Sequence, residues 1–171
     1  MKKSVILILV LALMLGITCA HAAPEDLIGT TLPDFTAETI DGSTFTLSES
    51  LKTHKLVVLN FWATWCGPCC MEFPFLETAW EQYSDRVDVI ALSIEGGDTF
   101  EVLSSFAEEY GLKFPIGRDD SGMFKSMEGQ YIPTTLIIGP DMTVLSAEVG
   151  AKSSPEEFYS LFDAELEKIG E

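Results

Sequence analysis

The chain is short of basic residues and of histidine. It has 10 lysines and arginines against 27 aspartates and glutamates, which gives a formal charge of −17 at pH 7. A surface this acidic repels nucleic acid and anionic lipid headgroups, so we expect no nucleic-acid partner. There are two histidines, and none follows His54. Repeats, low-complexity tracts and interdomain linkers are also absent, which favours one domain.

No apolar run reaches the length of about 20 residues that a membrane-spanning helix needs. The apolar run at 5–17 is shorter than this, and Lys2 and Lys3 precede it. The sequence Ala20-His21-Ala22 then supplies the small-x-small pattern that a signal peptidase recognises. We therefore predict that residues 1–22 are a signal peptide that is cleaved after Ala22 or Ala23.

The fate of residues 1–22 determines where we expect the protein to be and which residues its mature form contains. The alternatives to cleavage are an uncleaved N-terminal anchor and lipidation at Cys19. We expect the protein in the periplasm or on the outer face of the cytoplasmic membrane, with residues 23–171 as a single domain. Lys2 and Lys3 are lost with the signal, which has no acidic residue, so eight basic and 27 acidic residues remain and the charge is −19.

Cysteine is also scarce in the expected mature chain. Cys66, Cys69 and Cys70 remain, and all three fall within one short segment. They cannot cross-link distant parts of a fold, which is the usual role of cysteine in exported proteins. The cluster therefore indicates chemistry.

Hydrophobic patterning predicts an α/β fold. The order strand, helix, strand, helix indicates a βαβ unit with a parallel sheet and helices on both faces, to which a later hairpin adds an antiparallel edge. Residues 24–34 should be an extended lead-in. The expected strands are 35–38, 43–46, 56–62, 87–94, 114–116, 134–138 and 143–149, and the expected helices are 68–83 with a bend at Pro74, 99–110, 122–127 and 155–169.

Cys66 and Cys69 form a Cys-x-x-Cys motif that follows a strand and begins a helix. Two cysteines three positions apart can form a disulfide across one helical turn. The unpaired N–H groups and the dipole of the helix start stabilise a thiolate on Cys66, which makes it the nucleophile. Cys69 lies one turn inside and would resolve the mixed disulfide that Cys66 forms with a substrate. The alternative, half of a zinc site, would have only Cys70 and His54 as further ligands.

The residues Phe61-Trp62-Ala63-Thr64-Trp65-Cys66-Gly67-Pro68-Cys69 resemble the active-site stretch of thioredoxins, and Ile132-Pro133-Thr134 resembles the cis-proline loop of that family. The resemblance covers about residues 27–168. It implies a thioredoxin-like fold with a central mixed sheet and helices on both faces. It also implies that the loop at Pro133 packs on the disulfide and offers backbone groups to an extended substrate.

A narrower resemblance is to the TlpA/ResA group of exported thioredoxin-like reductants. Asn60 stands where cytosolic thioredoxins have a buried aspartate, and the sequence 69–74 is similar to that of the group. The segment 94–132 fits the group's extra central helix and strand, and the residues before 56 fit an N-terminal β-hairpin extension. In that group the glutamate at the position of Glu72 lies beneath the cysteine pair.

Glu72 follows Cys69 by three positions, so both project from one helix face. A buried carboxylate there would have a raised pKa and could exchange protons with Cys69; the alternative is a solvated surface residue. Cys70 points about 100° away from Cys69 around the helix. We expect it to be a spectator, with a modulating third thiol as the alternative.

The resemblance implies a thiol–disulfide oxidoreductase without a cofactor or metal, acting as a monomer. Gly67-Pro68 and Ile132 match the reducing branch of the family, so we expect a reductant of protein disulfides outside the cytoplasm. Its donor would be a membrane-embedded thiol electron carrier. Its substrates would be haem-site cysteines of apocytochrome c, which places it in cytochrome c biogenesis, or metal-centre assembly proteins.

Two other functions are possible on this fold. A copper-delivery module is suggested by Cys66 and Cys70, which have the spacing of thioredoxin-fold copper chaperones, but those proteins need a distal histidine. A thiol peroxidase would have a proline shortly before the reactive cysteine. No proline stands in the seven residues before Cys66, and Trp65 is adjacent to it.

Overall fold

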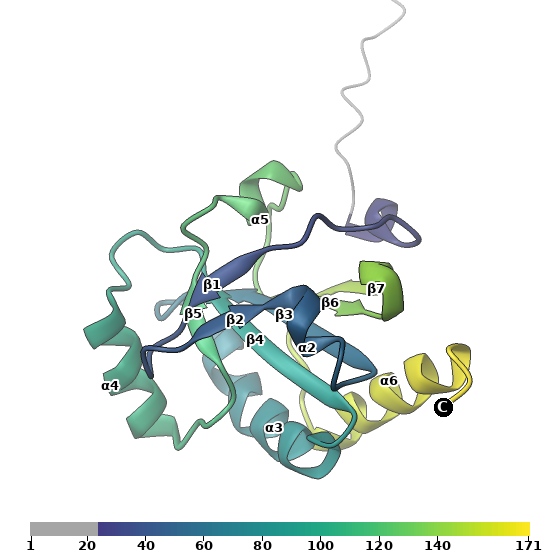
Figure 1. Ribbon diagram of the computed structural model, residues 1–171. Coiled ribbons are helices and arrows are strands. Elements are labelled where there is room, and N and C mark those ends of the chain that lie inside the picture. The colour runs from purple at the N-terminus through teal and green to yellow at the C-terminus, as the bar shows by residue number, and fades with distance from the viewer. Residues whose placement is uncertain (1–23) are drawn as a thin grey trace, which may run out of the picture.

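The computed structural model describes residues 24–171 (Figure 1). The expected signal peptide, its cleavage site and Cys19 lie outside the described residues. Between residues 24 and 171, no helix combines the length and the apolar character needed to cross a membrane.

A five-stranded mixed sheet forms the centre of the structure, in the order β5-β4-β3-β6-β7. Strand β3 pairs in parallel with β4 and antiparallel with β6, while β4 pairs in parallel with β5 and β6 antiparallel with β7. The expected mixed α/β sheet is confirmed. Its strands are β3 (Leu56–Trp62), β4 (Val87–Ser93), β5 (Ile116–Arg118), β6 (Thr134–Ile138) and β7 (Val144–Val149).

Strand β3 is buried along its whole length because both faces of the sheet are covered. Val58 and Trp62 belong to the core on one face, and Leu59 and Phe61 to the core on the other. This explains why the strand reads as a continuous apolar run instead of an alternating one. Its single polar residue, Asn60, points to the same face as Val58 and Trp62 because side chains alternate along a strand.

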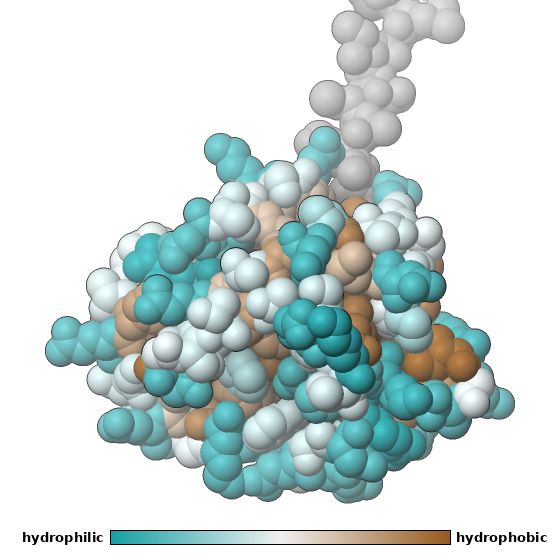
Figure 2. Space-filling view, in the orientation of Figure 1, coloured by the Kyte–Doolittle hydropathy of each residue, from teal (hydrophilic) through white to brown (hydrophobic). Residues whose placement is uncertain are grey.

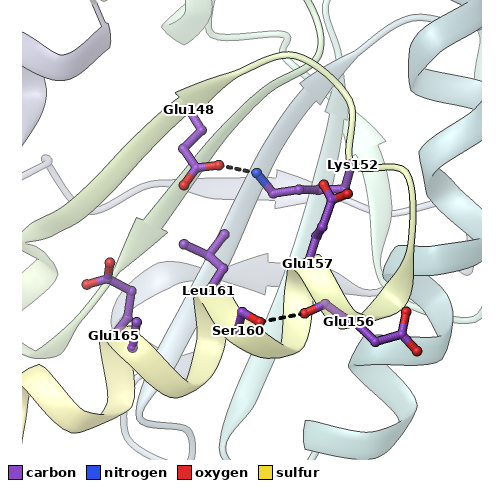
Figure 3. Close-up of a pocket in the computed structure, with 8 residues that line it drawn as sticks. Glu148, Lys152, Glu156, Glu157, Ser160, Leu161 and Glu165 are labelled. Atoms are coloured by element: carbon purple, nitrogen blue, oxygen red, sulfur yellow. Dashed lines mark hydrogen bonds and ion pairs between the residues drawn. The ribbon is translucent and has the colours of Figure 1, made fainter.

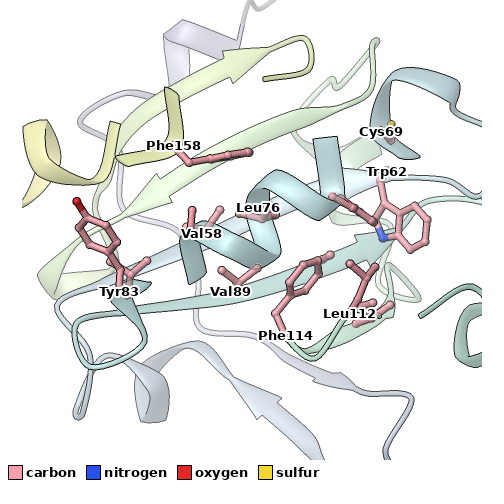
Figure 4. Packing of buried hydrophobic residues seen from close by; sticks show 14 of the residues in the cluster. Val58, Trp62, Cys69, Leu76, Tyr83, Val89, Leu112, Phe114 and Phe158 are labelled. Carbon is pink, nitrogen blue, oxygen red and sulfur yellow. The ribbon is translucent and has the colours of Figure 1, made fainter. Parts of the chain in front are cut away.

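Helices α3 (Gly67–Tyr83), α4 (Phe100–Tyr110) and α6 (Pro155–Lys168) contribute to the core on the face of Trp62. Figure 4 shows Leu76 of α3 and Phe158 of α6 packed over this face of the sheet. The ring of Trp62 contacts Phe73 and Phe106 at centroid distances of 4.6 and 4.8 Å. These edge-to-face and tilted contacts join the end of β3 to α3 and α4.

The opposite face is covered by the N-terminal hairpin and two short helices. Strands β1 (Thr36–Glu38) and β2 (Thr44–Thr46) pair antiparallel, as expected. The short helices are α2 (Leu47–Ser50) and α5 (Met123–Ser126). Hydrophilic residues cover most of the face seen in Figure 2, in line with the acidic composition.

The structure differs from the expected local structure at several points. The lead-in begins with a 3-10 helix, η1 (Pro24–Leu27), and a second one, η2 (Pro140–Met142), lies in the β6–β7 turn. Helix α2 was not expected, and β5 lies two residues later than expected. Helix α3 begins one residue earlier than expected and, as expected, includes Pro74.

Candidate active site

Cys66 lies at the junction of β3 and α3. It is the N-cap of α3, and its Sγ atom accepts a hydrogen bond from the backbone N–H of Cys69 at 3.3 Å. Gly67 begins the helix, and Pro68 in the first turn has no N–H that would need a partner. The sulfur of Cys66 therefore faces the positive end of the helix dipole, where a thiolate is stabilised.

Cys66 and Cys69 are joined by a disulfide, with their Cα atoms 5.3 Å apart. Cys69 is completely buried, and 4% of Cys66 is exposed. The first sulfur that an incoming substrate can reach is therefore that of Cys66.

The loop before β6 lies against this disulfide. The carbonyl oxygen of Ile132 is 3.7 Å from Sγ of Cys66, and the Ile132–Pro133 peptide bond is cis. The carbonyl of Pro133 accepts a hydrogen bond from the N–H of Gly150 at 2.9 Å. Residues that are 66 positions apart in the sequence thus meet at the ends of two paired strands.

Two exposed aromatic residues precede the two residues, Cys66 and Ile132, that meet at the disulfide. Trp65 precedes Cys66 and is 65% exposed, and Tyr131 precedes Ile132 and is 68% exposed. The indole N–H of Trp65 donates to the carboxylate of Glu95 at 2.9 Å, and this bond lowers the pKa of Glu95. Trp65 therefore offers exposed apolar area on the residue next to the one that carries the reactive sulfur.

Glu72 is completely buried on the core-facing side of α3. Its Oε1 accepts a hydrogen bond from Nδ2 of Asn60 and its Oε2 one from the backbone N–H of Lys152, both at 3.0 Å. Asn60 also donates to Oγ1 of Thr135 at 3.0 Å. The carboxylate is therefore held between α3, β3 and the loop that precedes α6.

Burial raises the pKa of Glu72 to about 7, because desolvation disfavours its charged form. The hydrogen bonds from Lys152 and Asn60 and the charge of Lys152 act in the opposite direction and are weaker. At neutral pH the carboxyl group can therefore either hold or release a proton. It lies one helical turn after Cys69 on the same side of α3, and the alternative of a solvated surface residue is wrong.

Cys70 is a free thiol on the adjacent side of α3. It donates to the carbonyl of Thr64 at 3.5 Å. Burial raises its pKa, with smaller contributions in the same direction from the negative charges of Asp98 and Glu109. The thiol therefore stays protonated at neutral pH.

Three residues at the site were not expected from the sequence. Asp98 is buried, and its carboxylate accepts from the N–H and hydroxyl of Thr64 at 3.0 and 2.6 Å. It fixes the segment before the motif, while Glu95 holds Trp65 and Lys152 holds Glu72. These contacts join residues that are distant in sequence, and Lys152 binds Glu72 through its backbone N–H, which every residue type except proline provides.

A metal-binding arrangement is not apparent in the part of the chain that the structure describes, where no three histidine, cysteine, aspartate or glutamate residues are grouped to hold an ion. His54 precedes β3, whereas Cys66 follows it, so the two lie at opposite ends of a seven-residue strand. The two residues therefore cannot share one copper ion.

The chain is similar to known proteins over most of its length. Residues 28–147 match the AhpC/TSA family. A relative from Oceanobacillus iheyensis, thiol-disulfide oxidoreductase ResA, is 34% identical over 158 residues, which cover 88% of this chain and 80% of the relative.

Two solved structures support the same assignment. A thiol:disulfide interchange protein of the thioredoxin family from Chlorobium tepidum is 25% identical with a TM-score of 0.70, covering 86% of this chain and 99% of that one. A secreted disulfide oxidoreductase of Mycobacterium tuberculosis, homologous to DsbE of E. coli, is 26% identical with a TM-score of 0.63, covering 76% of this chain and 95% of that one.

The names of the ResA relative and of the two solved structures describe thiol–disulfide chemistry, and they favour it over copper delivery and peroxide reduction. The mixed sheet flanked by helices agrees with the thioredoxin-like architecture of the solved structures. With its Cys66–Cys69 pair at a helix start, the chain belongs to the AhpC/TSA family and is a thioredoxin-fold thiol–disulfide oxidoreductase of the ResA and DsbE type.

Proposed function

We propose that this enzyme reduces protein disulfides outside the cytoplasm, with Cys66 as nucleophile, Cys69 as resolving thiol and Glu72 as proton acceptor. The observation that carries the proposal is the buried Glu72 carboxylate, whose pKa of about 7 suits a general base at neutral pH. Asn60 cannot take a proton, but it holds Glu72 in place. No cofactor besides the cysteine pair takes part.

The reaction has two displacement steps. The thiolate of Cys66 attacks one sulfur of the substrate disulfide, forms a mixed disulfide and releases the first substrate sulfur as a thiolate. Cys69 then gives its proton to Glu72, and its sulfur attacks the sulfur of Cys66. The second substrate sulfur leaves as a thiolate. The substrate has then gained two electrons, and the enzyme has been oxidised from the dithiol to the Cys66–Cys69 disulfide.

The loop at Ile132 and Pro133 serves as the substrate platform in this proposal. The Ile132 carbonyl beside Cys66 offers an acceptor to an extended peptide, and the exposed rings of Trp65 and Tyr131 offer apolar contacts. A substrate of this kind is an unfolded or flexible segment, which can lie across the loop while its disulfide reaches Cys66.

Glu72→Gln tests the proton-transfer step. General acid–base catalysis contributes about 10²- to 10⁴-fold, so resolution of the mixed disulfide near pH 7 should slow by that order. The attack of Cys66 should keep its rate, which stopped-flow measurements with a fluorescent model disulfide separate from resolution. Glu81→Gln, on the same helix, is the control for the loss of one charge. Equal resolution rates in wild type and Glu72→Gln would refute the role of Glu72.

The N-terminal pattern and the solved structure of a secreted oxidoreductase support a place for the reaction outside the cytoplasm. We propose an exported protein, cleaved near Ala22 or held by its N-terminus, that acts as a monomer. Reduction in an oxidising compartment requires an electron supply, for which we propose a membrane-embedded thiol carrier. Apocytochrome c is the substrate that we propose first.

Trapping in cells tests the partners. In Cys69→Ala the mixed disulfide on Cys66 cannot be resolved, so substrates stay attached and mass spectrometry can identify them. Capture of apocytochrome c from the extracytoplasmic fraction supports the proposal. Capture restricted to cytoplasmic proteins would contradict it.

A further inference from the structure

Lys152 contacts Glu72 through its backbone and is paired through its side chain with a second glutamate. Its N–H donates to Oε2 of Glu72 at 3.0 Å, and its ammonium forms an ion pair with the carboxylate of Glu148 on β7. The side chain of Lys152 is 16% exposed and that of Glu148 40% exposed. Figure 3 shows Lys152 reaching from the loop before α6 to Glu148 across an open pocket.

The groups around Glu72 differ in charge from one element to the next. Asn60 of β3 is neutral, and Cys69 of α3 is bound in the disulfide. The ammonium of Lys152 is the cation whose charge acts on Glu72 among residues 24–171. Beside Lys152 the pocket is lined by the carboxylates of Glu148 on β7 and of Glu156, Glu157 and Glu165 on α6, of which Glu165 is paired with Lys168.

We propose that Lys152 is a positioning residue that controls how readily Glu72 takes a proton, and that Glu148 sets the strength of this control. The inference rests on the proton-acceptor role proposed for Glu72. The ammonium favours the carboxylate form of Glu72, and the negative charge of Glu148 offsets part of that effect. Lys152 is poorly exposed, so water screens its field less than that of a surface lysine.

Replacing Lys152 or Glu148, the two partners of the ion pair, should shift the pH at which Glu72 titrates in opposite directions. Lys152→Gln removes the cation and leaves the charge of Glu148, so Glu72 should titrate at higher pH. Glu148→Gln leaves the ammonium unpaired, so Glu72 should titrate at lower pH. A nearby charge shifts a carboxyl group by up to about 1–3 pH units, and the partial offset here suggests about 0.5–1 unit for each variant.

The experiment follows the carboxyl carbon of Glu72 by NMR in oxidised, ¹³C-glutamate-labelled protein from pH 4 to pH 9. The resonance is assigned by its loss in Glu72→Gln. Lys152→Gln keeps the backbone N–H that binds Glu72, and Lys152→Met serves as a second variant if the first folds poorly. Lys55→Gln is the matched control, because it removes the same charge from an exposed pair with Glu171 at the other end of β3.

The expected result is an upward shift in Lys152→Gln, a downward shift in Glu148→Gln and none in Lys55→Gln. Shifts in one direction for both partners, or shifts no larger than in the control, would overturn the inference. The pH profile of mixed-disulfide resolution is then measured in the same variants. If the NMR midpoints move and the rate profile does not, Lys152 still controls Glu72, but the proposed role of Glu72 in the reaction fails.

Discussion

Replacing Glu72 with glutamine should change how the stability of the oxidised protein depends on pH. The pKa of Glu72 is raised from 4.5 to about 7 in the folded protein, chiefly by burial. Between these two values the folded state holds a proton that the unfolded state has released. The free energy of unfolding therefore falls as the pH rises from about 4.5 to about 7.

The size of this effect follows from the shift. Each pH unit corresponds to about 1.4 kcal/mol, so a shift of about 2.5 units amounts to about 3 kcal/mol. Glutamine has one acceptor oxygen for the two N–H groups of Asn60 and Lys152 that Glu72 binds. The free energy of unfolding of the variant is therefore lowered by about 1–3 kcal/mol for the unmade hydrogen bond, and this loss is the same at every pH.

Urea unfolding without reductant, followed by far-UV circular dichroism, gives the required free energies from pH 4 to pH 8. The free energy of unfolding of the wild type minus that of Glu72→Gln should decrease by about 3 kcal/mol from pH 4 to pH 8, because the wild type loses stability as the pH rises. Glu81→Gln is the control for net charge. If the difference between wild type and Glu72→Gln is constant with pH, Glu72 does not titrate in this range and the reasoning fails.

Three further predictions concern the motif and its support. In the reduced protein at pH 7, Cys66 should alkylate at least about ten times faster than Cys69, because the helix start stabilises its thiolate; mass-mapped iodoacetamide labelling measures this, and equal rates would reverse the roles. Cys70→Ala should change the rate of insulin reduction by less than about twofold, because its pKa is raised and a protonated thiol is a poor nucleophile; a larger loss would give Cys70 a part in the mechanism. Asp98→Asn should lower the free energy of unfolding by about 1–3 kcal/mol, because a buried acceptor is lost. The control is Asp120→Asn, at an exposed position, and equal stabilities of the two variants would show that Asp98 contributes little.

The sequence predicted the central elements well because their patterns are long. Strand β3 has the predicted ends, and α4 ends at Gly111, which adopts a left-handed conformation with φ of 68°. Helix α2 is a single turn, too short for a periodic pattern. Strand β5 begins late because the N–H of Phe114 binds Glu77 and Pro115 has no N–H, so ladder pairing starts after them.

At the site, too, the features that depend on local sequence could be predicted, and those that depend on tertiary contacts could not. The cysteine pair and the helix face of Glu72 could be predicted because local spacing determines them. The contacts of Asp98 with Thr64 and of Lys152 with Glu72 could not, because the chain must first fold to bring these residues together. Burial of Glu72, the source of its raised pKa, likewise depends on how the loop before α6 covers α3.

The pairing of β3 with β6 has a consequence for the order of assembly. Phe61, just before the motif, pairs with Thr134, just after the loop at Pro133. During synthesis the two cysteines leave the ribosome long before that loop does, so the dithiol exists for a time without its platform. In the function that we propose, substrate recognition therefore begins only when β6 and β7 have joined the sheet, which ties selective electron transfer to completion of the fold.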